Sequence, residues 1–423
     1  MSAATPGFVV VGIGADGWDG LSPRVRAELR SAAVILGSQR QLDLLPALPA
    51  TTIAWRSPMS AHLDAVLTGA PGAVPASPRV HLLASGDPMF HGLGATVVRA
   101  VGAERVEVFP AVSSASLACA HLGWDLAEVA VVSAVTADPE IILTEVTDGR
   151  RVLVLSRDAS TPARVAELLA AHGFGDSTFT VLAQLGGPRQ QVTASRVGSW
   201  DPGARVDPLN VIAVDCIGPR RSALPGRGED GFDHDGQITK STIRALTVCA
   251  LAPAGRQTLW DIGSGSGAVA IEWLRADPGG RAVAFEQDQT RSARIVANAR
   301  RHGVSSRIGL RGAAPAAFSD SATETDTPDA VFVGGGLDAA LLAAAWAALR
   351  PGGRLVANAV TIESQSLLAD WHRTHAGTLR RVAVDTAAPL GRYLAWRPAL
   401  PIVTWAGTKP SDTESGSIPS GAS

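Results

Sequence analysis

Residues 258–268 read TLWDIGSGSGA, and this stretch decides the fold of the C-terminal half of the chain. An apolar run ends at Ile262, glycines follow at alternate positions, and a helical pattern of apolar residues begins at Ala268. A loop without side-chain bulk between a buried strand and a helix lets a ligand approach the backbone closely. The stretch therefore predicts a Rossmann-like α/β domain with a nucleotide-type site at Gly263, Ser264, Gly265, Ser266 and Gly267.

A carboxylate ends the next predicted strand. Glu286 lies about twenty residues after the glycines, where a carboxylate can accept hydrogen bonds from both hydroxyls of a ribose. The spacing alone leaves two cofactors open, because Gly263-x-Gly265-x-x-Ala268 also satisfies a dinucleotide fingerprint.

Three features favour S-adenosylmethionine over a nicotinamide cofactor. Asp261 ends the strand, where it can face a positively charged amino acid group rather than a pyrophosphate. A helix opened by residues 237–240 precedes that strand, whereas a dinucleotide-binding chain usually starts at it. Residues 312–315 follow the third predicted strand, where class I methyltransferases enclose the adenine. A glycine-rich turn without a ligand is the structural alternative.

Short apolar strands alternate with helical periodicity in both halves, which predicts α/β layers whose helices cover largely parallel sheets. In the first half the predicted strands are residues 8–13, 34–36, 80–84, 106–109, 129–133, 151–155, 178–182 and 211–215. The predicted helices there are residues 22–31, 94–101, 114–122 and 161–172. In the second half we expect strands at 258–262, 281–286, 308–311, 330–333 and 354–357, and helices at 240–251, 268–276, 291–301, 338–349 and 362–374.

Proline, glycine and charged residues replace the apolar pattern between Gly218 and Gly236, which predicts a linker. We therefore expect a first domain at residues 1–218, a linker at 219–236 and a second domain at 237–408. The segment 409–423 is rich in Ser, Thr, Gly and Pro and is expected to be a disordered tail.

The composition argues against several classes of function. A net charge of −2 argues against a general nucleic-acid surface, and no apolar run reaches the length of a membrane span. The N-terminus lacks the pattern of a signal peptide. Cys119, Cys216 and Cys249 are widely spaced among apolar residues and lack metal-ligand spacing. We therefore expect reduced core cysteines, no metal site and a cytoplasmic location.

A second glycine turn, Gly12-x-Gly14-x-x-Gly17, follows the strand at residues 8–13 and matches the dinucleotide motif literally. The next predicted strand ends in Leu36-Gly37-Ser38, so no carboxylate is available to hold a ribose. We expect Gly12 and Gly14 to face a substrate rather than a nicotinamide nucleotide.

Two further segments follow apolar strands in the first half. Gly86-Asp87-Pro88 follows the strand at residues 80–84, and Ser113-Ser114 follows the strand at 106–109. Each alone is typical of a turn or a helix cap. Ligands bind at the carboxyl ends of strands in open α/β sheets, so together these segments indicate a site that contains Gly86, Asp87, Ser113 and Ser114.

These three segments of the first half resemble the tetrapyrrole methylase (class III methyltransferase) family. Residues 237–315, with VFVGGG at 331–336 and PLGR at 389–392, resemble the class I precorrin C-15 methyltransferases that also decarboxylate. Joined in this order, the halves resemble the bifunctional precorrin-6Y C5,15-methyltransferase (decarboxylating) family of vitamin B12 synthesis. The resemblance covers residues from about 6 to 407.

The resemblance implies an α/β fold in which a two-subdomain tetrapyrrole methylase-like domain precedes a Rossmann-like class I methyltransferase domain. It also implies two S-adenosylmethionine sites, a precorrin substrate and a homo-oligomer. In the C-terminal site, cofactor-contacting positions fall on Thr239, the Gly263–Gly267 loop, Glu286 and Ala314. In the N-terminal site they fall on Gly86, Asp87, Ser113 and Ser114. Residues 132–135 depart from the Ser-x-His-Gly-Arg often found there, which leaves the N-terminal substrate contacts open.

The implied activity is methylation of a precorrin at C-5 and C-15 with decarboxylation of its C-12 acetate side chain. Arg244 and Arg392 are candidates to bind peripheral carboxylates, and no residue is identified as catalytic. Three alternatives remain open. One is a single-site class I methyltransferase with an inert N-terminal domain, the second is a nicotinamide-dependent oxidoreductase using residues 12–17, and the third is a noncatalytic corrinoid-binding scaffold.

Overall fold

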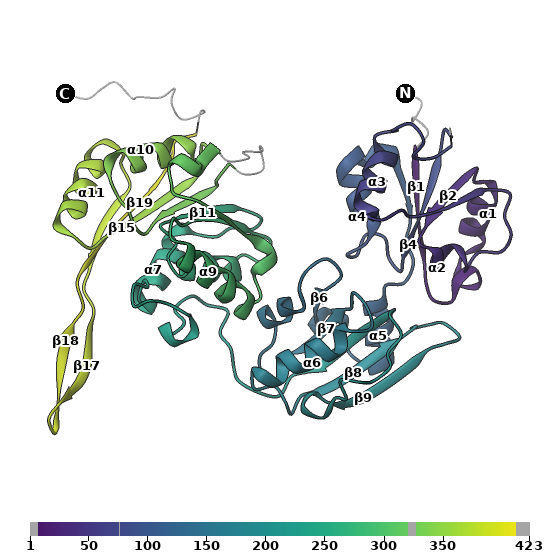
Figure 1. The fold of residues 1–423 in the computed structure, drawn as a ribbon, viewed down its shortest axis with the longest axis horizontal. Helices are drawn as coiled ribbons and strands as arrows, with labels where there is room; N and C mark the ends of the chain where they lie inside the picture. Colours follow the sequence, from purple (N-terminus) through teal and green to yellow (C-terminus); the bar gives the residue numbers. More distant parts are fainter. Residues whose placement is uncertain (1–6, 76, 320–326, 412–423) are drawn as a thin grey trace, which may run out of the picture. The chain divides into compact units, whose positions relative to one another are not determined.

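The computed structural model describes residues 7–75, 77–319 and 327–411 (Figure 1). The chain divides into two compact units, Met1–Arg220 and Arg221–Ser423. None of the helices in the described ranges has the length and apolar character needed to span a membrane. Residues 412–423 of the predicted tail lie outside the described residues.

The first sheet of the N-terminal unit has five parallel strands in the order β3-β2-β4-β1-β5. Successive residues of β1 pack on opposite faces: Phe8 and Val10 lie on the side of α3 and α4, whereas Val9 and Val11 lie on the side of α1. Burial on both faces explains the continuous apolar run. The elements are β1 Phe8–Ile13, α1 Pro23–Ser31, β2 Val34–Gly37, α2 Gln39–Leu42, β3 Thr51–Ala54, α3 Met59–Leu67, β4 Val80–Ser85, α4 Leu93–Val101 and β5 Val106–Phe109.

The second sheet of this unit has the order β6-β7-β10-β8-β9, and only β6 and β7 pair in parallel. The expectation of largely parallel sheets is therefore wrong here, because the short connection 184–190 makes β8 and β9 a hairpin. Helices α5 and α6 cover opposite faces. The elements are α5 Ser114–Leu122, β6 Ala130–Ser133, β7 Arg151–Leu155, α6 Thr161–Ala171, β8 Thr178–Ala183, β9 Gln191–Arg196 and β10 Asn210–Asp215.

The C-terminal unit is built on a seven-stranded sheet in the order β13-β12-β11-β14-β15-β19-β16. Its first five strands are parallel, and β19 runs antiparallel to both of its neighbours. Helices α7, α8 and α9 pack on one face and α10 and α11 on the other. The elements are α7 Ser241–Leu251, β11 Thr258–Ile262, α8 Ala268–Ala276, β12 Arg281–Phe285, α9 Gln289–Arg301, β13 Ile308–Arg311, β14 Ala330–Val333, α10 Ala339–Ala348, β15 Arg354–Ala359, α11 Ile362–Thr374, β16 Thr378–Val382 and β19 Ile402–Thr408.

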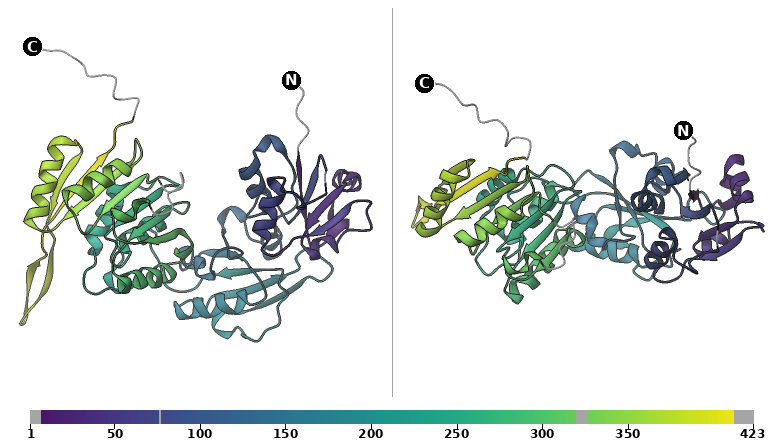
Figure 2. Two further views of the ribbon diagram at one scale, coloured as in Figure 1. Left: turned by 45° about the horizontal axis from the view of Figure 1, so that its top comes forward. Right: turned by 90° about the horizontal axis from the view of Figure 1, so that it is seen from above.

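A two-stranded hairpin lies between β16 and β19 in the chain and was not anticipated from the sequence. Within the described residues, strands β17 Asp385–Leu390 and β18 Tyr393–Pro398 pair only with each other. Figures 1 and 2 show the hairpin extending beyond the sheet of its own unit. Cys249 was expected in the core but is exposed on α7, whereas Cys119 and Cys216 are buried as expected.

Much of the predicted linker is part of the C-terminal unit. Gly226 and Arg227 donate backbone hydrogen bonds of 2.7 and 2.9 Å to the buried carboxylate of Glu272. Phe232 belongs to the core under α7 and α8, and its ring centroid lies 4.5 Å from that of His302. This packing leaves no apolar periodicity in the sequence, because the segment consists largely of charged residues and glycines and is anchored mainly through its backbone.

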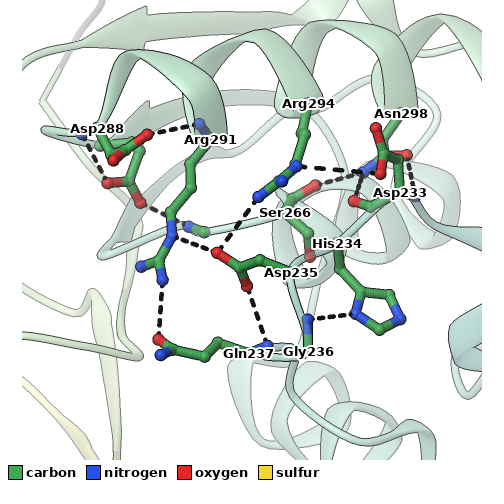
Figure 3. A network of polar contacts seen from close by, with 12 residues as sticks. Asp233, His234, Asp235, Gly236, Gln237, Ser266, Asp288, Arg291, Arg294 and Asn298 are labelled. Carbon is green, nitrogen blue, oxygen red and sulfur yellow. Dashed lines mark hydrogen bonds and ion pairs between the residues drawn. The ribbon is translucent and has the colours of Figure 1, made fainter.

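Residues 233–237 are fastened to helix α9 by a polar network (Figure 3). The side chain of Asn298 accepts a hydrogen bond from the Asp233 amide at 2.8 Å and donates to the carbonyls of Asp233 and Ser266, both at 2.9 Å. Arg291 and Arg294 form ion pairs with Asp235 at 2.9 and 3.2 Å. Asn298 thus joins this segment directly to the glycine loop.

We expect Asn298→Ala to lower the free energy of unfolding of the C-terminal unit by about 1–3 kcal/mol, because buried backbone groups lose their partners. Denaturant unfolding measures the change. Val296→Ala, a truncation at a partly exposed position of the same helix, should change stability by less than about 0.5 kcal/mol. Equal effects of the two substitutions would contradict the role given to the network.

Candidate active sites

The predicted glycine loop lies between β11 and α8 and has left-handed backbone at its three glycines. The φ angles are +68° at Gly263, +59° at Gly265 and +76° at Gly267, which residues with side chains rarely adopt. A Cβ atom at Gly263 would lie 2.8 Å from the backbone nitrogen of Gly335, in the segment after β14. Two backbone segments therefore meet closely at the carboxyl edge of the sheet.

Glu286 follows β12 and is 8% exposed beside this loop. One carboxylate oxygen accepts the amide N–H of Gly265 at 2.9 Å, and the other accepts that of Asp288 at 3.0 Å. A carboxylate oxygen has more than one acceptor position, so both remain able to accept a further hydroxyl. The predicted glycine loop and the carboxylate of Glu286 are thus directly hydrogen-bonded to each other.

Asp261 is buried at the start of the loop. Its Oδ2 accepts hydrogen bonds from the Ser264 hydroxyl at 2.8 Å and the Ala270 amide at 3.2 Å. Its Oδ1 is buried without a hydrogen-bond donor among the described residues. Burial raises the pKa of Asp261 to about 6. Ser264 therefore supports a neighbouring carboxyl group, and Oδ1 has unused acceptor capacity.

The remaining residues predicted for the C-terminal cofactor site have different surroundings. Thr239 is half-buried just before α7, and its carbonyl accepts a hydrogen bond from Arg244. Ser266 is buried and bonded through its carbonyl to Asn298. Ala314 is half-buried and packs against the core on the α10 face of the sheet.

The prediction that Arg244 binds a substrate carboxylate is wrong. Its side chain is fully buried and pairs with Glu272 at 3.0 Å. The guanidinium also donates to the carbonyls of Thr239 and Arg227 and lies 4.8 Å from the ring centroid of Phe232. Arg244 is therefore a positioning residue that holds the segment before α7.

Arg392 is exposed in the turn of the β17–β18 hairpin, where its guanidinium lies 5.0 Å from the ring centroid of Tyr393. Figure 1 shows the β17–β18 hairpin, whose turn contains Arg392, extending away from β11, the strand that precedes the glycine loop. Its predicted role as a ligand of substrate carboxylates therefore has no support from the geometry of its own unit.

The N-terminal unit contains a cavity of about 420 Å³, which lies between residues of its two sheets. Five residues predicted from the sequence line it: Gly14, Gly86, Asp87, Ser113 and Ser114. The Asp87 carboxylate accepts the amide of Met89 at 2.9 Å, and the Ser113 hydroxyl caps α5 by accepting the amide of Ser116 at 3.0 Å. Asp87 therefore stabilises a turn and Ser113 caps a helix, as their sequence context suggested, and both residues also line the cavity.

The expectation that Gly12 faces a ligand is wrong. Gly12 is buried at the end of β1, and a Cβ atom there would lie 2.4 Å from the carbonyl oxygen of Gly86. The residue must be glycine because two strand ends approach each other, which explains the literal match to a nucleotide motif. Gly14, two residues later, does line the cavity.

Three titratable residues of the cavity lining were not predicted: Arg40, His91 and Arg157. Burial lowers the pKa of His91, whose backbone has a left-handed φ of +52°. Arg157 could have been found, because it follows the predicted strand at residues 151–155 by two positions. Arg40 lies on α2, a helix of four residues that is too short to give a periodic signal.

The raised pKa of Asp261 predicts a pH-dependent stability. Between about pH 4 and pH 6 the folded chain keeps a proton on Asp261 that the unfolded chain releases. The contribution of Asp261 to the free energy of unfolding therefore falls by up to about 3 kcal/mol as the pH rises through this range. In Asp261→Asn this loss is absent, so the variant should gain stability relative to the unchanged protein from pH 4 to pH 7. Thermal unfolding across this range measures the difference, and a constant difference would refute the assignment.

Two family models match separate parts of the chain. A family model described as tetrapyrrole (corrin/porphyrin) methylases matches residues 7–201, and one described as a precorrin methyltransferase domain matches residues 230–409. The solved C-terminal domain of precorrin-6Y C5,15-methyltransferase from Rhodobacter capsulatus is 46% identical, with a TM-score of 0.42, and covers 45% of this chain and 100% of that chain.

Two curated relatives match nearly the whole chain. A precorrin-6Y C(5,15)-methyltransferase [decarboxylating] from Mycobacterium tuberculosis is 46% identical over 406 residues, which are 95% of this chain and 100% of the relative. A protein of the same name from Sinorhizobium sp is 39% identical over 413 residues, which are 96% of this chain and 97% of the relative. The chain therefore belongs to the precorrin-6Y C(5,15)-methyltransferase (decarboxylating) family.

Proposed function

We propose that the chain methylates a precorrin at C-5 and C-15 and decarboxylates its C-12 acetate side chain, with one S-adenosylmethionine site in each unit. The observation that carries this proposal is that two different methylase family models match separate units, each with its own candidate site. C-5 methylation is assigned to the domain at residues 1–218. C-15 methylation and decarboxylation are assigned to residues 237–408, together with the segment 226–236 that packs on them.

The C-terminal site fits S-adenosylmethionine. Both oxygens of Glu286 can accept ribose hydroxyls while they hold the glycine loop. The unused Oδ1 of Asp261 suits the ammonium group of the cofactor's amino acid. Arg244 holds the backbone at Thr239 by donating a hydrogen bond to its carbonyl oxygen. Ala314 follows β13, where its backbone could contact an adenine.

The N-terminal site is proposed to hold the second cofactor against Gly86, Asp87 and the Ser113-Ser114 turn. These residues share one cavity whose wall is largely apolar, which suits both an adenosyl group and the face of a macrocycle. Gly14 lies in the same wall and would contact the macrocycle.

The sulfonium of S-adenosylmethionine supplies an activated methyl group, so the chain's task is to align it with a carbon nucleophile and to exclude water. The attacked meso carbons of a reduced macrocycle are enamine-like, so no strong base is needed for attack. Decarboxylation leaves an electron pair that the conjugated macrocycle can take up. Apolar lining residues such as Leu83, Leu155 and Leu182 would keep the N-terminal reaction dry.

Glu286→Ala tests the division of labour between the two domains. Loss of a charged hydrogen-bond acceptor should weaken C-terminal cofactor binding by about 10- to 100-fold, so that calorimetry with S-adenosylmethionine detects one strong site instead of two. Mass spectrometry of precorrin-6Y, or its reduced form, should show less C-15 methylation and decarboxylation than C-5 methylation.

Glu363→Ala is the matched control, because it removes an exposed carboxylate from α11. It should leave all three reactions unchanged. An equal loss of all three reactions in Glu286→Ala would contradict the assignment of domains. A single strong site in the unchanged chain would favour an inert N-terminal domain, and binding of NADH alone would favour an oxidoreductase.

We further propose that the chain forms a homo-oligomer through the β17–β18 hairpin and resides in the cytoplasm, where its free cysteines stay reduced. An isolated two-stranded hairpin is marginally stable in water. This one exposes Leu390, Tyr393, Leu394 and Trp396 by 60–73% of their surface. A second copy of the same hairpin offers matching apolar side chains to cover them.

Replacing Leu394 and Trp396 together by Ser should therefore shift the protein to a smaller species in light scattering, because the apolar contact between copies is lost. Ile362→Ser is the control, since Ile362 is 79% exposed on α11. It should keep the mass of the unchanged protein. The hairpin is not the interface if the double variant also keeps that mass.

A further inference from the structure

Two guanidinium groups line the N-terminal cavity from different sheets. Arg40 lies on α2, directly after β2 of the parallel sheet, and Arg157 follows β7 of the mixed sheet. The other titratable residues of the lining are Asp87 and His91. Two fixed positive charges thus face one carboxylate, so the wall of the cavity carries an excess of positive charge.

Arg40 is held in place by neutral partners. Its terminal nitrogen donates to the Ser85 hydroxyl at 2.8 Å, and Ser85 also accepts the side-chain amide of Gln41 at 3.0 Å. Burial lowers the pKa of Arg40, Asp207 acts in the opposite direction, and Arg189 adds to the lowering. Arginine stays charged under these conditions. No carboxylate of the described residues lies within ion-pair distance of it.

Arg157 is held by backbone carbonyls. Its Nε donates to the carbonyl of Val135 at 3.1 Å, and a terminal nitrogen donates to that of Ala137 at 2.9 Å. These bonds fix the plane of the guanidinium and leave further N–H groups for a ligand, because the group has five donors. It too lacks an ion-pair partner within the described parts of the chain. Val135, which it contacts, also lines the cavity.

We propose that Arg40 and Arg157 each bind a peripheral carboxylate of the macrocycle and so set its orientation in the N-terminal cavity. This inference rests on the function proposed above for that cavity. A planar guanidinium with fixed orientation matches a carboxylate through two parallel hydrogen bonds. Arg40 is half-buried, which strengthens its contact, whereas Arg157 is exposed and relies on the orientation that its two carbonyl partners impose. Two such groups on opposite sheets hold a rigid ring at two points of its edge, while the apolar lining contacts its face.

The cofactor also carries a carboxylate, so the experiment must separate the two sources. In the full-length chain we compare Arg40→Gln, Arg157→Gln and Arg157→Lys with Arg99→Gln, which removes an exposed charge from α4 of the same unit. Initial rates of C-5 methylation give KM for the precorrin. Calorimetry gives Kd for S-adenosylmethionine, and thermal unfolding checks that each variant is folded.

We expect each Gln variant to raise KM for the precorrin about 10- to 100-fold, with Kd for S-adenosylmethionine unchanged within about twofold. Arg157→Lys should have an intermediate KM, because it keeps the charge without the planar fork. Arg99→Gln should match the unchanged chain. An increase in Kd for S-adenosylmethionine that equals the increase in KM would assign the arginines to the cofactor and overturn the proposal.

An unchanged KM in both folded Gln variants would also overturn it. If Gln variants fail to fold, Arg157→Lys and an Arg40→Lys variant supply the same comparison, and unchanged KM in both would count against the proposal. The proposed function itself would fail on a separate measurement, namely if the unmodified chain transferred no methyl group to C-5 of the precorrin.

Discussion

The structure depends on burying parallel strands on both faces. Leu259 and Trp260, neighbours in β11, pack into opposite cores, as Val9 and Val10 do in β1. A strand covered on both faces has room for polar chemistry only at its ends, and in a parallel sheet the carboxyl ends lie on one edge. The glycine loop, Glu286 and the Gly86-Asp87 turn occupy such ends for this reason.

A buried ion pair supports the C-terminal edge. Removing Arg244 and Glu272 from water is costly, and the cost is offset only because both groups make further hydrogen bonds. Those bonds all go to the backbone of residues 226–239. The charges therefore specify the path of a segment that has few apolar side chains of its own, and they fix the backbone at Thr239 just before α7.

The burial of side chains explains which strands and site residues could be predicted from the sequence. Strands such as β7 and β11 were found with correct bounds because both of their faces are apolar. β9 and the hairpin strands were missed, since their mostly exposed residues show no such run. Arg244 and Arg157 look alike as letters. The position of Arg157 just after a predicted strand could have pointed to the cavity that it lines. Only the fold reveals that Arg244 is enclosed with Glu272 and that Gly12 is required by packing rather than by a ligand.

The packing of residues 226–236 also defines what can be moved as a module. A gene fragment beginning at residue 237, where the apolar pattern resumes, would lack the backbone amides that bind Glu272 and Asn298. These two buried side chains would then lose hydrogen-bond partners. The transferable C-terminal piece therefore begins before Gly226. A piece of this chain that is meant to carry the intact C-terminal unit therefore has to start between Arg221, where that unit begins, and Gly226, where its backbone is first bound to Glu272.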